Sequence, residues 1–310
     1  MPSDLTCLAI TGPTASGKTE IALALAEEYP IEIISMDSAM VYRGMDIGTA
    51  KPVPAIRQRV PHHLIDILDP EQSYSAGRFA HEAAHLIESI SAAGRIALIV
   101  GGTMLYLRAL REGIAQLPGR DSAVRARIDA EAAATSWPDL HARLAEVDPV
   151  TAGRIKPTDR QRIQRALEVY EVTGRSLSAL HGEAMRPGMA VDTIALIPED
   201  RQILAQSISD RFAQMIRGGF VDEVRRLHAR PGLTADCSSM RAVGYRQIWA
   251  YVAGHNDLAT ATGHAIIATR QLAKRQLTWL RRDQRSTKIA AGDKGLPRLL
   301  KERIEALLVA

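Results

Sequence analysis

The chain has 310 residues, a hydrophobic content of 46%, a charged content of 24% and a net charge of +4, which are ordinary values for a globular protein and allow one large α/β domain with a smaller second domain. Its two cysteines, Cys7 and Cys237, lie far apart, which excludes a disulfide framework and a cysteine zinc site. The sequence has no apolar run of membrane-spanning length and leaves no room for a signal peptide before its first expected strand, so we expect a cytoplasmic protein without membrane contact.

A phosphate-binding loop follows that first strand, which we expect over residues 5–10. The eight residues fit G-x-x-x-x-G-K-[ST], and a helical pattern follows from Lys18 to Glu28. The backbone N–H groups of such a loop surround an anion, while its lysine adds a positive charge and Thr19 can ligate Mg²⁺. The predicted diphosphate-binding residues of this loop are Gly12, Pro13, Thr14, Ala15, Ser16, Gly17, Lys18 and Thr19.

Two further buried strands are predicted before residue 118. The first covers Ile31 to Ser35 and leads into Asp37, which would lie at the same sheet edge as the phosphate loop. Taken alone, Asp37 could equally be a turn or helix-cap residue. The second strand, Ile96 to Val100, runs into Gly101-Gly102-Thr103, where an ATPase usually has an acidic residue for Mg²⁺. Asp66 is the other candidate for that metal role, or else a turn residue.

Residues 118–190 form a predicted all-helical insertion, because alanine- and arginine-rich helical patterns follow one another without a strong strand. In the helix after Thr158, Ile163 lies on an apolar face and Gln161, Arg162 and Arg165 lie on a polar face. That polar face is either solvated or suited to RNA phosphates and bases.

The C-terminal third returns to the core domain with a strand over Thr193 to Ile197. Residues 191–310 carry 19 basic and 12 acidic residues, and Arg270 to Lys288 alone contains seven basic residues and one acid. A long helix is predicted over Ala265 to Arg282, with Trp279 expected in its core contacts. Its charge indicates a polyanion-binding surface or a solvated basic helix.

Six segments along the chain form a distinctive set, namely residues 37–52, His62-His63-Leu64-Ile65-Asp66, Tyr74-Ser75 with Phe79, Gly101 to Tyr106, Arg160 to Glu168 and Gly244-Tyr245-Arg246-Gln247. Together they resemble the tRNA dimethylallyltransferase family, also called the tRNA isopentenyltransferase family, over nearly the whole chain. The resemblance implies an α/β fold with a P-loop NTPase-like parallel sheet flanked by helices, formed by residues 1–117 and 191–310. It also makes residues 118–190 a helical domain that contacts tRNA. The zinc finger of some eukaryotic relatives is missing.

The resemblance implies transfer of a dimethylallyl group from dimethylallyl diphosphate to N6 of the adenosine on the 3′ side of the anticodon. Asp37 would be the general base, Thr103 and Lys18 would assist catalysis, and Arg211 would bind the diphosphate together with the loop and Mg²⁺ on Thr19. The protein would act as a monomer on the tRNA anticodon stem-loop. The expected tRNA-binding residues are Asp37, Ser38, Ala39, Met40, Thr103, Arg125, Gln161, Arg162, Ile163, Gln164, Arg165, Cys237, Arg241, Gly244, Tyr245, Arg246 and Gln247.

Three other functions remain open at this point. The protein could instead be a related enzyme that prenylates free AMP, ADP or ATP to make cytokinin. The helical insertion and the basic C-terminal helix favour RNA as the substrate. A small-molecule kinase would bind ATP on the same loop and transfer phosphorus in place of carbon. A regulator that only binds RNA would not need Asp37.

Overall fold

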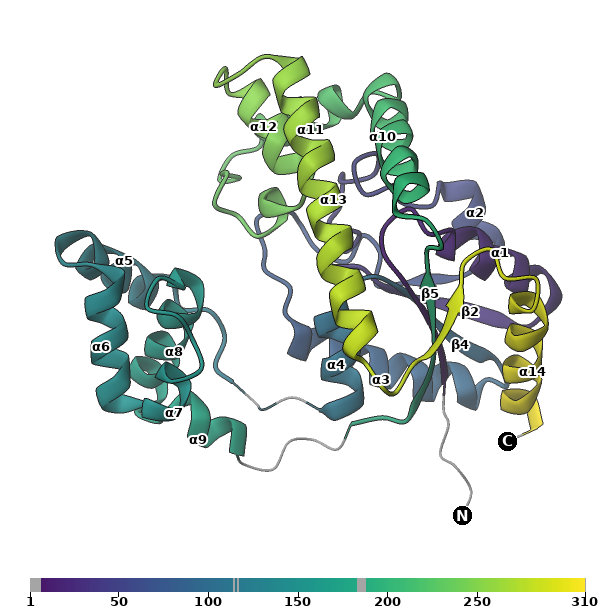
Figure 1. Cartoon of the computed structure of the whole chain (residues 1–310), viewed down its shortest axis with the longest axis horizontal. Coiled ribbons are helices and arrows are strands. Elements are labelled where there is room, and N and C mark those ends of the chain that lie inside the picture. The colour runs from purple at the N-terminus through teal and green to yellow at the C-terminus, as the bar shows by residue number, and fades with distance from the viewer. Residues whose placement is uncertain (1–6, 114, 116, 183–187, 310) are drawn as a thin grey trace. The chain divides into compact units, whose positions relative to one another are not determined.

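The computed structural model describes residues 7–113, 115, 117–182 and 188–309 (Figure 1). These divide into two compact units, Met1–Arg111 with Met189–Ala310, and Glu112–Gly188. The first unit contains all six strands, which are β1 (Cys7–Thr11), β2 (Ile31–Met36), β3 (His62–His63), β4 (Ile96–Gly101), β5 (Val191–Ile197) and β6 (Thr287–Ala290). Its longer helices are α1 (Lys18–Glu28), α3 (Ala76–Ala92), α4 (Met104–Glu112), α10 (Arg201–Arg217), α11 (Phe220–His228), α12 (Tyr245–Val252), α13 (Leu258–Arg282) and α14 (Leu296–Val309), and its shorter ones are α2 (Pro54–Arg59) and the 3₁₀ turn Ser239–Arg241.

The strands form one parallel sheet in the order β3-β2-β4-β1-β5-β6. The two central strands, β1 and β4, are almost entirely buried, which explains their unbroken apolar sequences. The predicted α/β fold with a parallel sheet flanked by helices is therefore confirmed. Residues 5 and 6 of the first predicted strand lie outside the described residues.

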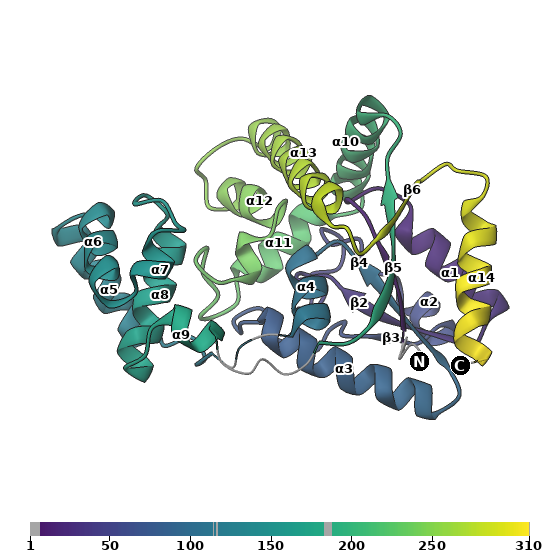
Figure 2. The same cartoon turned by 60° about the horizontal axis from the view of Figure 1, so that its bottom comes forward.

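Helices cover both faces of the sheet. α1 and α14 lie side by side and pack on one face through Leu25, Leu296 and Leu300 (Figures 1 and 2). α3 contacts β2 and β4 from the other face, where Phe79 and Ile87 are fully buried. This arrangement leaves the carboxyl ends of β1, β2 and β4 together at one edge, which is where ligands bind in such sheets.

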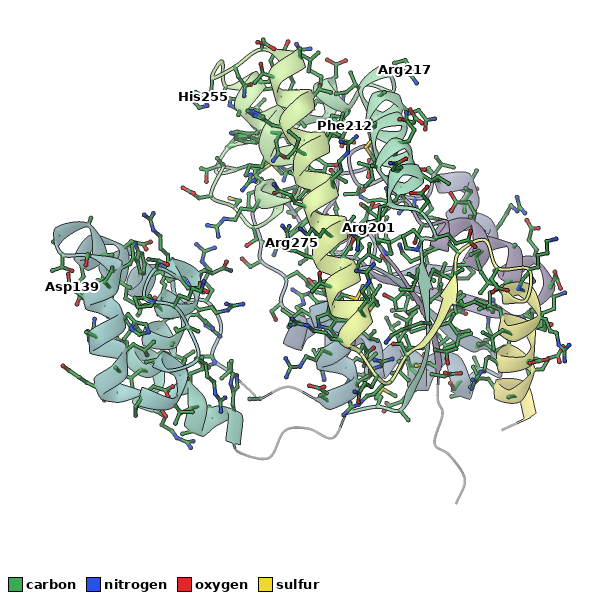
Figure 3. The ribbon with its side chains drawn as sticks, in the orientation of Figure 1. Asp139, Arg201, Phe212, Arg217, His255 and Arg275 are labelled. Atoms are coloured by element: carbon green, nitrogen blue, oxygen red, sulfur yellow. The ribbon has the colours of Figure 1, made fainter. Side chains whose placement is uncertain are left out.

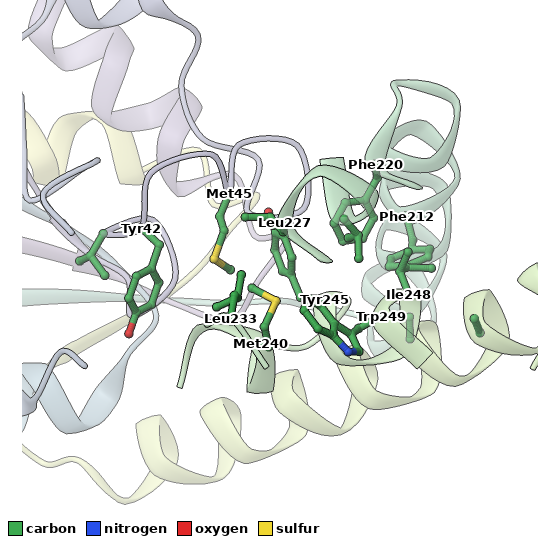
Figure 4. Packing of buried hydrophobic residues seen from close by; sticks show 14 of the residues in the cluster. Tyr42, Met45, Phe212, Phe220, Leu227, Leu233, Met240, Tyr245, Ile248 and Trp249 are labelled. Atoms are coloured by element: carbon green, nitrogen blue, oxygen red, sulfur yellow. The ribbon is translucent and has the colours of Figure 1, made fainter. Parts of the chain in front are cut away.

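Helices α10 to α13 build a second core beyond that edge. Its centre is a group of aromatic rings in which Phe220 packs edge-to-face on Tyr245 at 4.9 Å and on Phe212 at 6.0 Å (Figure 4). Tyr42 and Met45, from the loop after β2, are buried in the same core. The aromatic core therefore fixes the loop that leaves the strand carrying Asp37.

The second unit is all-helical. Its helices are α5 (Ser122–Ala134), α6 (Trp137–Val147), α7 (Pro149–Ala152), α8 (Arg160–Thr173) and α9 (Leu177–Gly182). Side chains of Asp121, Ser136, Asp148 and Asp159 cap four of these helices by accepting backbone N–H bonds. The unit has its own apolar core, which contains Ile128, Leu144 and Ile163. At the chain's return to the first unit, Met189 N donates to Leu110 O at 2.9 Å.

Two edge strands, β3 and β6, were not predicted. β3 has only two residues, and both are histidines that are half-buried. β6 begins at the end of the basic stretch Arg270 to Lys288 and has no buried residue. Neither has the long apolar run by which a buried strand is recognised in a sequence.

Candidate active site

The phosphate loop connects β1 to α1 with the backbone shape that its glycines predict. Gly17 has a φ of 81° immediately before α1, a conformation that a residue with a side chain rarely adopts. Ala15 also has a positive φ, 60°, so the loop is held in an unfavourable conformation at one residue. Lys18 Nζ folds back over the loop and donates to Pro13 O at 2.6 Å and to Ser16 Oγ at 3.3 Å. An anion in the loop would therefore meet the lysine ammonium as well as the backbone N–H groups.

Two cationic side chains, Lys18 of the phosphate loop and Arg211 of α10, lie in surroundings that disfavour their charged forms. Burial, followed by the charge of the nearby Arg211 guanidinium, lowers the pKa of Lys18 to about 8, although the charge of Asp37 opposes the change. Burial also lowers the pKa of Arg211, whose Nη2 donates to Thr49 O at 3.4 Å. Two cations held this close without full solvation form a site for an anion of high charge.

Asp37 lies where β2 ends, as predicted. Its Oδ1 accepts hydrogen bonds from Ala39 N at 2.8 Å and Met40 N at 3.3 Å, so one oxygen fixes a tight turn. Within the described part of the chain, no side chain forms an ion pair with Asp37, and its second oxygen receives no hydrogen bond. Asp37 thus serves as a turn residue through one oxygen, and the other has no hydrogen-bond partner among the described residues.

Thr103 closes the turn from the neighbouring strand. Ser38 N donates to Thr103 Oγ1 at 3.2 Å, and Thr103 N donates to Met36 O at 3.2 Å. A Cβ on Gly101 would lie 2.1 Å from Met36 O, so only glycine allows the ends of β2 and β4 to approach this closely. The Thr103 hydroxyl accepts one bond here and retains its proton for a bound group.

A cleft of about 1020 Å³ joins these elements. Among the residues predicted to bind donor or tRNA, it is lined by Thr14, Ala15, Ser16, Gly17, Lys18, Thr19, Asp37, Ser38, Ala39, Met40, Thr103, Arg211, Arg241 and Tyr245. Helix α13 lines the cleft with Leu272, Arg275 and Trp279. Figure 3 labels Arg275 on this helix. The structure therefore brings the phosphate loop, Asp37, Thr103 and Arg211 to one cleft. Gly12 and Pro13, the first two residues of the loop, are buried beneath it.

The alternative metal role of Asp66 is not supported by its contacts. Its Oδ1 accepts from Lys51 Nζ at 2.6 Å and its Oδ2 accepts from Arg57 Nη1 at 2.7 Å. Both carboxylate oxygens are therefore neutralised by cations. Across residues 7–113, 115, 117–182 and 188–309, no three histidine, cysteine, aspartate or glutamate side chains gather closely enough to hold a metal ion by themselves. An Mg²⁺ ion on Thr19 would need oxygens from the diphosphate and water, which is the common way in which Mg²⁺ is bound.

The predicted tRNA-binding residues of the C-terminal segment differ in exposure. Arg241 and Arg246 are exposed and Cys237 is half-buried, whereas Gly244 and Gln247 are buried, with Gln247 Oε1 accepting from Gly244 N at 2.9 Å. Tyr245 is fully buried, and its hydroxyl donates to Glu223 Oε1 at 2.6 Å. Its side chain therefore belongs to the protein's own core.

Glu223 is a buried carboxylate for which the sequence predicted no role. It accepts hydrogen bonds from the backbone N–H groups of Asp46, Ile47 and Gly48 at 2.7 to 3.1 Å. Burial, followed by the charge of Glu223, raises the pKa of Tyr245, so the phenol stays protonated as a donor. Glu223 and Tyr245 together hold the loop whose next residue, Thr49, contacts Arg211.

In the helical unit, two of the predicted tRNA-binding arginines form ion pairs with the buried carboxylate of Glu168. Arg125 bonds both oxygens of this fully buried carboxylate at 2.8 Å, and Arg165 Nη1 bonds it at 2.7 Å. Burial raises the pKa of Glu168, but the bonds from these arginines lower it more, so the pKa lies below its usual value. Arg125 and Arg165 therefore stabilise the unit itself.

The remaining predicted residues of α8 are divided between surface and core. Gln161 is exposed, and the Arg162 side chain is 72% exposed with an ion pair to Asp159 at 2.8 Å. Gln164 Nε2 donates to Asp129 Oδ1 at 2.7 Å. Ile163 is fully buried, so its side chain belongs to the core of the unit. Among the predicted residues of this helix, Gln161 and Arg162 are therefore the exposed ones.

The helices of the described ranges include none that is both long and apolar enough to cross a lipid bilayer.

Comparisons with known proteins agree on one family. Residues 40–283 match the IPP transferase family. The chain is 58% identical to the tRNA dimethylallyltransferase of Ralstonia nicotianae over 280 residues, covering 88% of this chain and 87% of the relative. It is 51% identical to the tRNA dimethylallyltransferase of Paraburkholderia phytofirmans over 316 residues, covering 99% of both chains.

Solved structures show the same similarity in three dimensions. The full-length tRNA isopentenylpyrophosphate transferase of Bacillus halodurans has a TM-score of 0.68 and 35% identity, covering 97% of this chain and 96% of that one. A eukaryotic dimethylallyltransferase acting on tRNA has a TM-score of 0.77 and 25% identity, covering 96% of this chain and 77% of that one. Together with the cleft and its phosphate loop, these matches show that the chain belongs to the IPP transferase family.

Proposed function

We propose that the cleft transfers a dimethylallyl group from dimethylallyl diphosphate to N6 of the adenosine on the 3′ side of the anticodon in tRNA. The C1–O bond of the donor breaks, the N6–C1 bond forms, one N6 proton leaves and diphosphate is released. The observation that carries this proposal is that Asp37, with one free carboxylate oxygen, lines the same cleft as the phosphate loop and Arg211. The chain is thus a prenyltransferase that modifies tRNA.

The phosphate loop, Lys18 and Arg211 bind and stabilise the departing diphosphate. Positive charge that develops at C1 is spread over the allyl group, so the protein mainly has to stabilise the negative leaving group. The half-buried Lys18 and Arg211 interact more strongly with that charge than solvated cations would. Loss of the diphosphate is therefore the step that these residues assist.

Asp37 accepts the proton of the attacking amine. The lone pair of N6 is conjugated into the adenine ring, so the amine becomes acidic only as the new bond forms, and a carboxylate must be close at that moment. The Ala39 and Met40 N–H groups hold Oδ1, so Oδ2 would accept the proton. The Thr103 hydroxyl, which accepts from the N–H of Ser38, the residue after Asp37, would contact the adenine.

Mg²⁺ is the proposed cofactor, with the Thr19 hydroxyl as its ligand from the protein. When bound, the ion would neutralise part of the diphosphate charge. Thr19 stands at the first turn of α1 and lines the cleft, which suits a ligand set completed by diphosphate oxygens and water.

The tRNA would reach the cleft past Arg241 and Arg246 and contact the exposed residues of α8, and the target adenosine would have to leave its stack to enter. We propose that the protein acts as a monomer. We place it in the cytoplasm, where tRNA modification generally occurs. The high identity to tRNA-modifying relatives does not favour the free-nucleotide or kinase alternatives.

The test is the mass of adenosine released from tRNA after incubation with the protein, Mg²⁺ and dimethylallyl diphosphate. The expected product is adenosine in which one dimethylallyl group replaces a hydrogen. Modified free AMP with unmodified tRNA would support cytokinin synthesis, and phosphate transfer from ATP would support a kinase. If none of the three products forms, the protein binds RNA without catalysing a transfer.

A further inference from the structure

Gln276 of α13 connects two segments of the active site that are far apart in the sequence. Its Oε1 accepts a hydrogen bond from Thr14 N in the phosphate loop at 3.1 Å. Its Nε2 donates to Gly102 O, at the end of β4, at 2.9 Å. One amide group thus joins the donor-binding loop to the strand end that carries Thr103.

The backbone around this amide is shaped to admit it. A Cβ on Gly102 would lie 2.5 Å from Gln276 Nε2 and 3.1 Å from Gly12 O. A side chain at position 102 would therefore push the glutamine away and crowd the phosphate loop. Gly102 therefore leaves the space that the Gln276 side chain occupies.

The loop also needs support from outside itself. Ala15, next to Thr14, has a positive φ, which is unfavourable for a residue with a side chain. Lys18 Nζ supports the loop through Pro13 O, but the same ammonium must turn to a bound diphosphate. Among the described residues, the side chains of Lys18 and Gln276 form hydrogen bonds with the loop. The Gln276 contact does not have to break when the donor binds.

We propose that Gln276 is a positioning residue for the donor site, which holds the phosphate loop in its diphosphate-binding shape through Thr14 N. This inference rests on the proposed function, because it assumes that the loop binds the donor diphosphate. Gln276 touches no reacting atom. It acts through the loop, and its own helix also packs on α12 next to the predicted tRNA-binding segment.

The test compares Gln276→Met, which keeps the length but loses both hydrogen bonds, with Gln271→Met, an exposed glutamine of the same helix. Calorimetry measures the Kd of dimethylallyl diphosphate and of inorganic diphosphate with Mg²⁺. For Gln276→Met we expect both Kd values to rise about tenfold, as for the loss of one or two net hydrogen bonds. The donor KM should rise with them, while kcat at saturating donor changes less than threefold and Gln271→Met behaves as wild type.

A double-mutant cycle with Gly102→Ala tests the contact itself, because the new methyl group would displace the same amide from its other side. Each single change should weaken diphosphate binding, and the double mutant should be no weaker than the worse single mutant. Additive losses would overturn the proposal. Unchanged Kd values in Gln276→Met, with a lower melting temperature, would also overturn it and leave a purely structural role.

Two outcomes separate the failure of this inference from the failure of the proposed function. Wild-type protein that binds neither form of diphosphate would disprove donor binding on the loop. If Gln276→Met does not fold, Gln276→Leu replaces it, since leucine has a similar volume and also loses both hydrogen bonds. Gln276→Leu should bind diphosphate more weakly than wild type, and equal binding would overturn the proposal.

Discussion

Asp37 has two carboxylate oxygens in different surroundings, and its replacement separates their roles. Asp37→Asn keeps an oxygen for Ala39 N and Met40 N but removes the proton acceptor. We expect single-turnover transfer to slow by roughly 10²- to 10⁴-fold, with donor affinity and melting temperature nearly unchanged. Rapid-quench transfer, donor calorimetry and a melting curve measure the three quantities. A near-normal transfer rate would remove Asp37 as the general base.

The lowered pKa of Lys18 predicts that donor affinity depends on pH. Its pKa is lowered to about 8 in the free protein, and a bound diphosphate favours the charged ammonium and raises that pKa. Donor affinity should therefore be flat from pH 6.5 to 7.5 and fall above pH 8, by up to about tenfold per pH unit. Calorimetry across this range measures it. Lys18→Ala, which binds weakly throughout, should show no such fall, and the same slope in the variant would assign the titration to another group.

At the level of single residues, the sequence predicted the parts of the site that depend on local spacing. The phosphate loop, Asp37 and Thr103 each follow a strand, so the ends of the strands fix their place. Gln276 could not be predicted, because its partner Thr14 is remote in the chain and a glutamine on a basic helix has no pattern of its own. Glu223 was hidden for the same reason, since a lone acid in a helix is usually solvated.

Among the elements, the loop between β2 and α2 depends on Glu223 of α11 and Tyr245 of α12. Tyr245→Phe removes one bond from a buried carboxylate, and we expect it to lower the free energy of unfolding by about 1–3 kcal/mol. Chemical denaturation measures the loss. Tyr29→Phe, whose hydroxyl meets Glu305 at the surface, is the matched control and should lose less than about 0.5 kcal/mol. Equal losses would mean that Glu223 finds another donor.

Two arginines of α8 should behave differently because their partners differ. Arg162 is exposed, so Arg162→Ala should lower the slope of log tRNA affinity against log salt, by up to about 0.9 for one phosphate contact. Arg165→Ala leaves the buried Glu168 with one arginine fewer and should destabilise the helical unit. Binding across a salt series and melting curves distinguish the two effects. A stable Arg165→Ala protein with a reduced salt slope would show that Arg165 contacts RNA directly.

The four core strands could be predicted from the sequence, whereas the two edge strands of the sheet could not. β1, β2, β4 and β5 are buried on both faces, so each appears in the sequence as a run of apolar residues. β3 and β6 are short, half-exposed and polar, and pairing with a neighbouring strand defines them. Their formation depends on the completed sheet, which a local pattern does not contain.

For the whole molecule, the two units predict a separation of donor and tRNA functions. Leu110 and Met189 are joined by a hydrogen bond, so a short glycine-serine linker can replace residues 112–188 without stretching the first unit. We expect this variant to bind diphosphate as wild type does and to lose most tRNA affinity. Calorimetry and filter binding measure the two. Full tRNA affinity without the helical unit would confine RNA binding to the first unit.

The position of β5 in the sheet also affects how the protein is made. β5 pairs directly with the central strand β1, yet the ribosome completes it only after the entire helical unit has been synthesised. Until then β1 has one open edge, and nascent chains with unpaired strand edges are prone to aggregate. A helical unit of mostly local contacts folds quickly, and once folded it holds the chain on either side of it close together. We therefore expect the folded insertion to help β5 reach its place beside β1 during translation.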